Sequence, residues 1–237
     1  LDCYNQLINS CKSGLLSVNH CQLYTGWNIL SSVLFLFTCE MSNVAVFGAT
    51  GMVGLCVLKA AVEKGLNVQA LLRYPNKLPK EYQGKVSYVQ GDVFNAEDVR
   101  KTLEGQDAAI VVLGTGNSVG SKGLTNVIAG MKELNIKVVS VCLSSNVFIP
   151  PEKDRPMFPG VVAEHRRMFA ILKDSGLQWI AVNSPYIMDM RPTGYITAHS
   201  IIKGDPGVSK YDLGRFFVDC LSMPEHYQKS VGITSKR

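Results

Sequence analysis

Three glycines, Gly48, Gly51 and Gly54, are spaced three residues apart at the point where an apolar run is followed by a helical pattern. The spacing begins at Gly48, directly after the apolar residues 44–47, and the helical pattern continues to Lys64. At such a junction glycine permits the tight turn, lets a pyrophosphate approach the backbone, and allows close packing of helix on strand. The start of the helix adds free N–H groups and a partial positive charge. A turn without a ligand is the alternative, but it is disfavoured directly after the first strand of an alternating chain. We expect dinucleotide contacts from Gly48, Thr50, Gly51, Val53 and Gly54.

The second apolar strand is followed by cations rather than by an acid. An NAD-binding protein usually carries Asp or Glu there to hold the ribose 2′-hydroxyl, whereas a 2′-phosphate needs a cation. Here Arg73 follows the strand and Lys77 comes next, with no acid before Glu81. A guanidinium pairs with phosphate as a planar fork, and an ammonium adds a point charge. The sequence therefore favours NADPH/NADP, held at the 2′-phosphate by Arg73 and Lys77, and Asn76 between them is a further expected cofactor contact. A solvated surface pair is the alternative for the two cations.

Two further strand ends carry candidate cofactor residues. Asp92 and Val93 follow the third strand, where a carboxylate can accept from the adenine amino group. Gly114 and Thr115 follow the fourth strand, where a small residue allows close approach to the ribose or the diphosphate. Loop Asp and Gly are also ordinary turn residues, so a purely structural role is open for both pairs.

These residues need a scaffold that brings strand ends together. The expected strands are 44–47, 67–72, 86–90, 108–113, 138–143 and 179–182, and the expected helices follow the glycine loop and cover 95–105, 124–134, 161–173 and 212–221. Alternation of this kind, with short connections, predicts an α/β fold with a doubly wound parallel sheet, Rossmann-like and forming a single domain. The carboxyl ends of all strands then lie along one edge, where ligands bind.

Composition sets outer limits on function. The chain has 237 residues, of which 46% are hydrophobic and 18% charged, which excludes disordered, collagen-like and coiled-coil proteins. No apolar run reaches the roughly 20 residues of a membrane-spanning helix. Seven Cys without regular spacing and only four His argue against a disulfide scaffold or a zinc site, and no metal is expected. The net charge of +5 comes without a Lys/Arg run, so neither nucleic acid nor membrane is an expected partner.

The first forty residues differ from the rest. They hold four of the seven Cys, one Lys and no Arg, and they show neither helical nor strand periodicity. A signal peptide would need a positive start and a small-residue cleavage site, and both are missing. We expect residues 1–40 to be a non-native or unstructured extension, and 41–237 to form the NADP-binding Rossmann-like domain. The three Cys that remain after Met41 fit a reducing cytosol.

Short motifs along the main body together resemble a known family. They are the glycine loop, Leu72-Arg73, Gly91-Asp92-Val93, Gly105-Gln106-Asp107-Ala108, Leu113-Gly114-Thr115, Ser175-Gly176-Leu177 and Ser209-Lys210-Tyr211-Asp212-Leu213-Gly214. In this set the chain resembles the NADPH-dependent flavin reductases, also called biliverdin reductase B, from about residue 42 to 221. The resemblance implies a monomeric cytoplasmic enzyme of heme catabolism. Such an enzyme passes a hydride from NADPH to flavins (FMN, FAD, riboflavin) or to linear tetrapyrroles such as biliverdin-IX beta.

The resemblance also implies where the reacting groups lie. It places Ser144, at the end of the fifth strand, beside the nicotinamide, and His165 near the nicotinamide ribose. Cys142 is expected as a small buried residue whose backbone lines the cofactor, because no nearby cation would activate its thiol. Tyr186 and Ile187 follow the sixth strand as cofactor contacts, and Ser144 and Tyr186 are the catalytic candidates. The nearest reductases carry His at the position of Tyr186, and a phenol with a pKa of about 10 is a poorer proton donor than imidazole.

The sequence lacks the Tyr–Lys pair that acts as the proton donor in short-chain dehydrogenases. Short-chain dehydrogenases use Tyr followed four residues later by Lys, and none of the nine Tyr residues here has Lys at that spacing. A localised carbonyl needs such an acid, whereas an isoalloxazine or a tetrapyrrole delocalises the incoming charge and can take its proton from water. The absence favours a conjugated acceptor and weakens a nucleotide-sugar epimerase. It suits equally a non-catalytic NADP(H)-binding redox sensor that acts through a protein partner.

Overall fold

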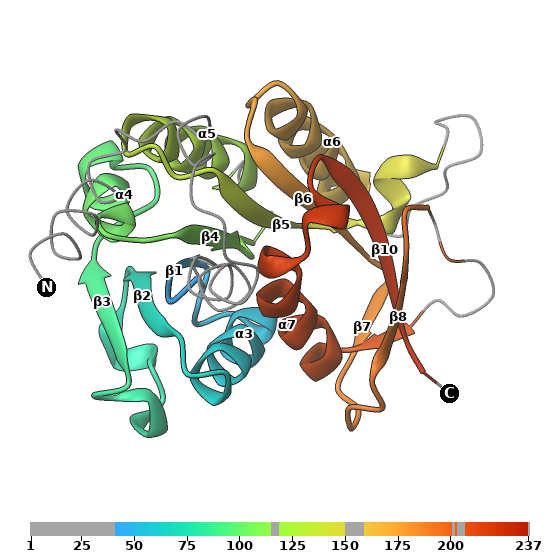
Figure 1. Ribbon diagram of the computed structural model, residues 1–237, viewed down its shortest axis with the longest axis horizontal. Helices are drawn as coiled ribbons and strands as arrows, with labels where there is room; N and C mark the ends of the chain where they lie inside the picture. Colours follow the sequence, from blue (N-terminus) through green and yellow to red (C-terminus); the bar gives the residue numbers. More distant parts are fainter. Residues whose placement is uncertain (1–40, 115–118, 150–158, 201, 203–206, 237) are drawn as a thin grey trace, which may run out of the picture. The chain divides into compact units, whose positions relative to one another are not determined.

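Eight strands form one sheet in the order β3-β2-β1-β4-β5-β6-β10-β8 (Figure 1). The computed structural model describes residues 41–114, 119–149, 159–200, 202 and 207–236, which belong to one compact unit, Met41–Arg237. The strands are β1 (Asn43–Phe47), β2 (Asn67–Leu72), β3 (Val86–Gln90), β4 (Ala108–Val111), β5 (Val138–Ser144), β6 (Gln178–Ser184), β8 (Tyr195–Ala198) and β10 (Lys229–Ser235). A second, two-stranded sheet pairs β7 (Tyr186–Met188) with β9 (Gly207–Ser209). The expectation for residues 1–40 stays a prediction, because they lie outside the described residues.

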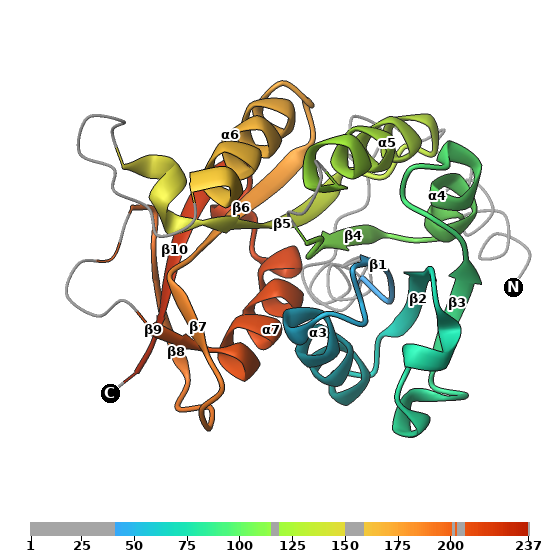
Figure 2. The ribbon, with the colours of Figure 1, turned by 180° about the vertical axis from the view of Figure 1, so that it is seen from behind.

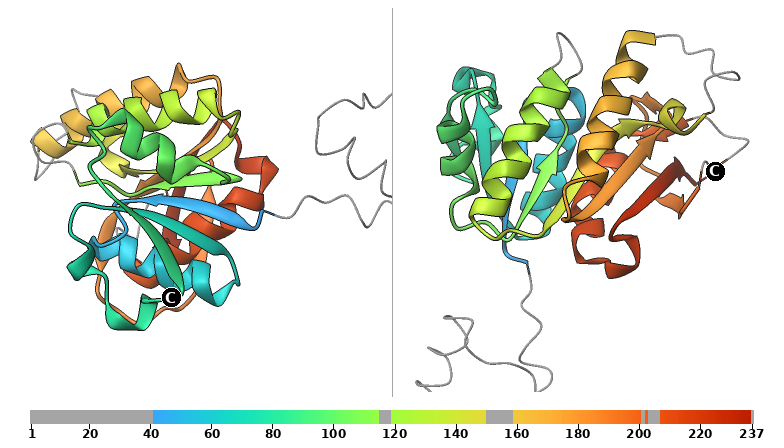
Figure 3. Two further views of the ribbon diagram at one scale, coloured as in Figure 1. Left: turned by 90° about the vertical axis from the view of Figure 1, so that its left-hand side faces the viewer. Right: turned by 90° about the horizontal axis from the view of Figure 1, so that it is seen from above.

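Helices cover both faces of the large sheet (Figures 2 and 3). They are α3 (Met52–Glu63), α4 (Ala96–Leu103), α5 (Val119–Glu133), α6 (Pro159–Lys173) and α7 (Lys210–Asp219), with short 3-10 helices at Pro75–Lys77, Lys80–Tyr82, Ser145–Phe148, Cys220–Ser222 and Pro224–His226. Strand side chains alternate between two cores: Val44 and Val46 pack toward α3 and α7, and Ala45 and Phe47 toward α4, α5 and α6. The predicted doubly wound α/β fold is therefore confirmed.

The sheet reverses its strand order between β1 and β4. On one side of this point the chain continues to β2 and β3, and on the other to β5 and β6, with all of these strands parallel. In open α/β sheets the crevice at such a switch point, outside the carboxyl ends of the strands, is where ligands bind. The topology therefore places the glycine loop after β1 beside the strand ends that follow β2, β4 and β5.

The C-terminal part of the sheet corrects the sequence prediction. β10 lies parallel to β6, but β8 pairs antiparallel with β10, so the sheet is mostly rather than wholly parallel. Neither strand, nor the small β7–β9 sheet, is predicted from the sequence. The reason is composition, because β10 reads KSVGITS and β8 has only four residues, too short for an apolar period.

One predicted helix boundary is also wrong. α5 is expected from residue 124, yet within the described residues the helix already begins at Val119. Two glycines in its first turns, Gly120 and Gly123, make this segment resemble a loop. They serve packing instead, because a Cβ would lie 2.5 Å from Met168 at Gly120 and 2.9 Å from Leu113 at Gly123. Tertiary contact here outweighs the low helix propensity of glycine.

Among residues 41–236, as far as they are described, no helix is long and apolar enough to cross a membrane. The same part of the chain contains no group of three or more His, Cys, Asp or Glu that could hold a metal ion.

Candidate functional site

The glycine loop has the geometry that a bound phosphate requires. Gly48 has φ +90°, and a Cβ there would lie 2.4 Å from the carbonyl oxygen of Val112. At Gly54 a Cβ would lie 2.1 Å from the carbonyl oxygen of Gly48, so only glycine lets α3 pack on the loop. Gly51 is the N-cap of α3, no side chain caps the helix, and its first turn carries no acid. The start of α3 is thus open to an anion, and the loop fits a pyrophosphate.

A groove of about 370 Å³ runs from this loop across the ends of β1, β2, β3 and β4. It brings together most of the predicted cofactor residues: Gly48, Thr50, Gly51, Arg73, Lys77, Asp92, Val93 and Gly114. Four of the residues predicted at the glycine loop and at these strand ends are not among its lining residues, and the first is Gly54, which packs against the loop. The side chain of Val53 packs into the core, so only its backbone could serve a cofactor. Asn76 is exposed and is not among the lining residues, and Thr115 lies outside the described residues.

Two cations of the groove share one aromatic ring. The Nζ of Lys77 lies 4.9 Å and the guanidinium carbon of Arg73 5.9 Å from the centre of the Tyr74 ring. Cation–π attraction to that ring, which is 56% exposed, brings both charges to one rim of the groove. The sequence prediction missed Tyr74, although an aromatic residue next to Arg73 was a usable signal. The pair of cations, rather than an isolated Arg, faces the place where a 2′-phosphate is expected.

Asp92 has a structural role in addition to its place in the groove. Its Oδ1 accepts a hydrogen bond from the backbone N–H of Phe94 at 3.0 Å. Its own N–H donates to Oδ2 of Asp98 at 3.0 Å. These bonds define the turn between β3 and α4. The turn role that the sequence left open is therefore present, and among the described residues the second carboxylate oxygen of Asp92 accepts no hydrogen bond.

A second cavity, of about 450 Å³, opens at the ends of β5 and β6. All five residues predicted for the nicotinamide end line it: Cys142, Ser144, His165, Tyr186 and Ile187. They come from β5, α6 and β7, segments distant in sequence, so the topology brings them together. Its described lining contains no Lys, Arg, Asp or Glu. The cavity is thus an uncharged pocket next to the groove along the sheet edge.

His165 is held as a neutral ring in the wall of this pocket. Its Nδ1 accepts the backbone N–H of Ser144 at 2.9 Å, so the ring proton belongs on Nε2. Burial lowers the pKa of His165 to about 4, and the nearby Glu164 carboxylate only partly opposes this shift. His165 therefore fixes the end of β5 and offers an N–H donor rather than a charge.

Glu164, next to His165, connects two helices. It is 1% exposed, and its Oε1 accepts the backbone N–H of Ser121 in the first turn of α5 at 2.7 Å. Its Oε2 pairs with Nε of Arg167 at 2.8 Å. Burial raises the pKa of Glu164, but the bonds from Ser121 and Arg167 outweigh burial and leave the pKa below its usual value. The carboxylate thus connects α6, and with it His165, to α5, and no sequence pattern predicts this contact.

Cys142 and Tyr186 occupy opposite environments in the same pocket. The Sγ of Cys142 lies 3.3 Å from Oγ of Ser184, and burial raises the pKa of this thiol. A protonated thiol agrees with the small packing role expected from the sequence. The ring of Tyr186, in contrast, is 57% exposed at the rim. It offers a flat apolar surface rather than a buried acid.

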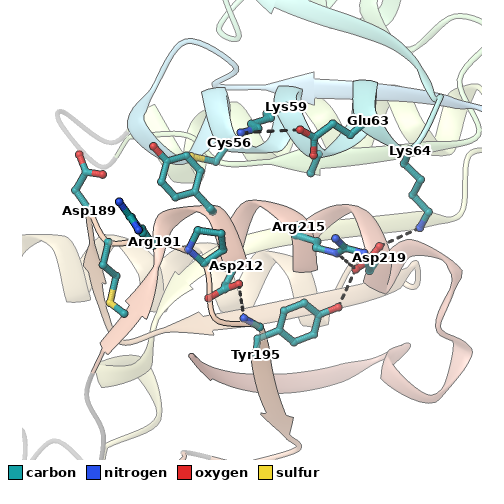
Figure 4. A pocket seen from close by; sticks show the side chains of 15 residues that line it. Cys56, Lys59, Glu63, Lys64, Asp189, Arg191, Tyr195, Asp212, Arg215 and Asp219 are labelled. Atoms are coloured by element: carbon teal, nitrogen blue, oxygen red, sulfur yellow. Dashed lines mark hydrogen bonds and ion pairs between the residues drawn. The ribbon is translucent and has the colours of Figure 1, made fainter. Parts of the chain in front are cut away.

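A larger cavity, of about 800 Å³, lies along α3, α7 and the segment after β7 (Figure 4). Several of its charged side chains are paired: Lys59 with Glu63, Lys64 and Arg215 with Asp219, and Asp189 with Lys210. Its described lining includes none of the predicted site residues and no part of the glycine loop. For this reason the two smaller cavities form the candidate site, although each has a smaller volume.

Comparison with known proteins agrees with this geometry. The model of a family described as NAD(P)H-binding matches residues 48–224. Among solved structures, a short-chain dehydrogenase/reductase from Veillonella parvula in complex with NADP has a TM-score of 0.69 at 15% identity, covering 83% of this chain and 95% of that one. A protein from Bacillus halodurans named as an NAD-dependent epimerase/dehydratase has a TM-score of 0.73 at 16% identity, covering 83% and 95%. ChuY, named as an anaerobilin reductase from Escherichia coli O157:H7, has a TM-score of 0.70 at 19% identity, covering 81% and 97%. At these identities the three structures show a shared fold.

Proposed function

Because this chain belongs to the NAD(P)H-binding family, we propose that it is an NADPH-dependent reductase of flavins and linear tetrapyrroles. The observation that carries the proposal is the uncharged pocket at the ends of β5 and β6, with the exposed ring of Tyr186 at its rim. The described lining offers no Lys and no Tyr–Lys pair to protonate a localised oxyanion. Such a pocket suits a flat, conjugated acceptor that delocalises charge.

The preference for NADPH rests on the groove. Arg73 and Lys77 would hold the 2′-phosphate, and the start of α3 behind Gly51 would hold the pyrophosphate. NADH lacks the 2′-phosphate, so the two cations would contribute nothing to its binding. The same groove therefore binds both dinucleotides but discriminates between them.

The pocket residues supply orientation and access. Bound NADPH supplies the hydride. His165 keeps the Ser144 backbone in place through the bond to Nδ1 and offers Nε2–H to a ribose or an acceptor. The ring of Tyr186 stacks on the acceptor, and its exposure leaves the rim open to water, which delivers the proton.

The similarity to ChuY supports the proposal only through the shared fold and a name that gives anaerobilin as the substrate of that protein. A monomeric, cytoplasmic enzyme belongs to the same proposal. A redox sensor without turnover is kept as an outcome of the test.

A steady-state panel tests the function. NADPH oxidation is followed by its absorbance with FMN, riboflavin, biliverdin-IX beta and a simple ketone, and each reaction is repeated with NADH. We expect turnover with the flavins or the bilin, none with the ketone, and a higher KM for NADH. Turnover of the ketone alone contradicts the proposal. NADPH binding without oxidation by any acceptor replaces the enzyme with the sensor.

A further inference from the structure

One amide in the pocket wall is buried with an atom that has no partner. Asn183 lies on β6, in register with Leu143 of β5 and Gly232 of β10, and is 2% exposed. Its Nδ2 donates to Oγ of Ser230 at 2.6 Å. Within the described part of the chain, its Oδ1 has no hydrogen-bond partner, although Asn183 lines the pocket of about 450 Å³. A buried carbonyl oxygen without a partner is uncommon, because folding removes its hydrogen bonds to water and no bond within the protein replaces them.

The structure provides a comparison for this oxygen. Among the described residues, Gln106 is the other side chain with a buried, unpartnered oxygen. Gln106 lies in the turn after α4, where its Nε2 donates to the carbonyl oxygen of Glu104 at 3.1 Å, and it lines none of the three cavities described above. Among the described residues, the amide of Asn183 alone combines an unused acceptor with a place in the lining of a cavity.

We infer that Oδ1 of Asn183 recognises the acceptor by taking a hydrogen bond from an imide or lactam N–H group. The inference rests on the proposed function and deepens it. The described lining has no charged side chain, so the ligand edge that enters is neutral. Along β6, Trp179 and Ala181 pack toward α6, and alternation places Asn183 on that same face.

The same pocket also contains a hydrogen-bond donor. His165 comes from α6 and carries its ring proton on Nε2, so the pocket offers an acceptor from β6 and a donor from α6. An N–H next to a carbonyl matches such a pair. The pyrimidine edge of an isoalloxazine and the terminal rings of a linear tetrapyrrole both carry that group. One pocket can thus accept two acceptors of different overall shape.

A pair of flavins that differ in one hydrogen tests the inference. Lumiflavin has an N3–H, and 3-methyllumiflavin has a methyl group there. Each is titrated into the protein saturated with NADP⁺, and binding is read from the quenching of flavin fluorescence, without turnover. We expect the wild type to bind lumiflavin about three- to tenfold more tightly, as one neutral hydrogen bond implies.

Two variants assign the preference to Asn183. Asn183→Leu has a similar size and no acceptor, and should bind the two flavins equally, within about twofold. The matched control Gln106→Leu should keep the wild-type preference. Circular dichroism and thermal unfolding verify that both variants fold, and the wild-type comparison of the two flavins holds even where a variant does not.

The primary amide of nicotinamide is the other source of such an N–H, and a separate titration distinguishes it. Loss of NADP⁺ affinity in Asn183→Leu, with the flavin preference intact, overturns the inference. Equal binding of both flavins by the wild type overturns it as well. A protein that binds flavins with the expected preference but transfers no hydride refutes the proposed function alone. A protein that binds and reduces both flavins equally well refutes this inference and leaves the proposed function intact.

Discussion

Acid should destabilise this protein through the buried ring of His165. The ring is 9% exposed, and its Nδ1 accepts the Ser144 N–H, so the folded protein keeps it neutral. Its pKa is about 4 in the folded state, against about 6.5 in an unfolded chain. Below pH 6.5 the unfolded chain therefore binds a proton that the folded protein does not, and the equilibrium moves toward unfolding.

The size of the effect follows from the two pKa values. A difference of about 2.5 units, at 1.36 kcal/mol per unit, corresponds to about 3 kcal/mol. This contribution is complete above pH 6.5 and is lost as the pH falls toward 4. Against a typical total of about 5–15 kcal/mol, such a loss is easily measured.

Urea unfolding at several pH values between 4 and 7.5 measures the free energy of unfolding. His165→Asn is the informative variant, because its Oδ1 can take the place of Nδ1 but does not titrate in this range. His226, whose pKa is also lowered by burial, titrates in both proteins and cancels in the comparison. We expect the wild type to lose about 3 kcal/mol more than the variant between pH 7 and 4. Parallel curves, or an imidazole pKa near 6.5 by NMR, would refute the reasoning.

Three other substitutions test separate parts of the site. Arg73→Ala should raise the KM for NADPH about ten- to a hundredfold and leave the KM for NADH nearly unchanged. The control Lys85→Ala should alter neither KM. An equal rise in KM for both cofactors would exclude recognition of the 2′-phosphate by Arg73. Gly54→Ala should destabilise the fold by about 1–3 kcal/mol, because its Cβ would lie 2.1 Å from a backbone oxygen, whereas Gly160→Ala meets nothing within 4 Å and should be neutral in thermal unfolding. Tyr186→Phe should keep most of the turnover with FMN; a loss of 10²-fold or more in kcat would make the phenol the proton donor and end the solvent-proton mechanism.

The positions of the candidate cofactor residues could be predicted because backbone geometry determines where the glycine loop and the strand ends lie. A strand, a turn that only glycine can adopt at Gly48, and a helix start have a fixed spacing in the sequence. Once strands and helices alternate, strand ends meet at one edge, so Arg73 and Ser144 could be placed without coordinates. The same logic fails at Val53, because a position near the loop does not say which way the side chain points.

Other features of the site depend on contacts between segments far apart in sequence. Glu164 and Ser121 are 43 positions apart, and Asn183 and Ser230 are 47 positions apart. No local sequence pattern predicts that the Glu164 side chain is buried, or that one atom of the Asn183 side-chain amide has no partner. β10, which contributes Ser230, has a polar sequence and was not predicted at all. These features arise from tertiary packing, which secondary-structure propensity and hydrophobic periodicity do not predict.

On the proposed function, affinity and selectivity for the acceptor would come from different places in the pocket. Tyr186 is 57% exposed at the rim, so stacking on its ring helps any flat acceptor, whatever its polar groups. Asn183 is 2% exposed in the wall, where an acceptor that brings no N–H leaves Oδ1 unpaired and is disfavoured. The two residues are separated by Ser184 and Pro185 and share no hydrogen bond in the structure. On the proposed function, such a pocket would bind planar molecules broadly and would select among them by one buried oxygen, so that a single site would serve both flavins and bilins.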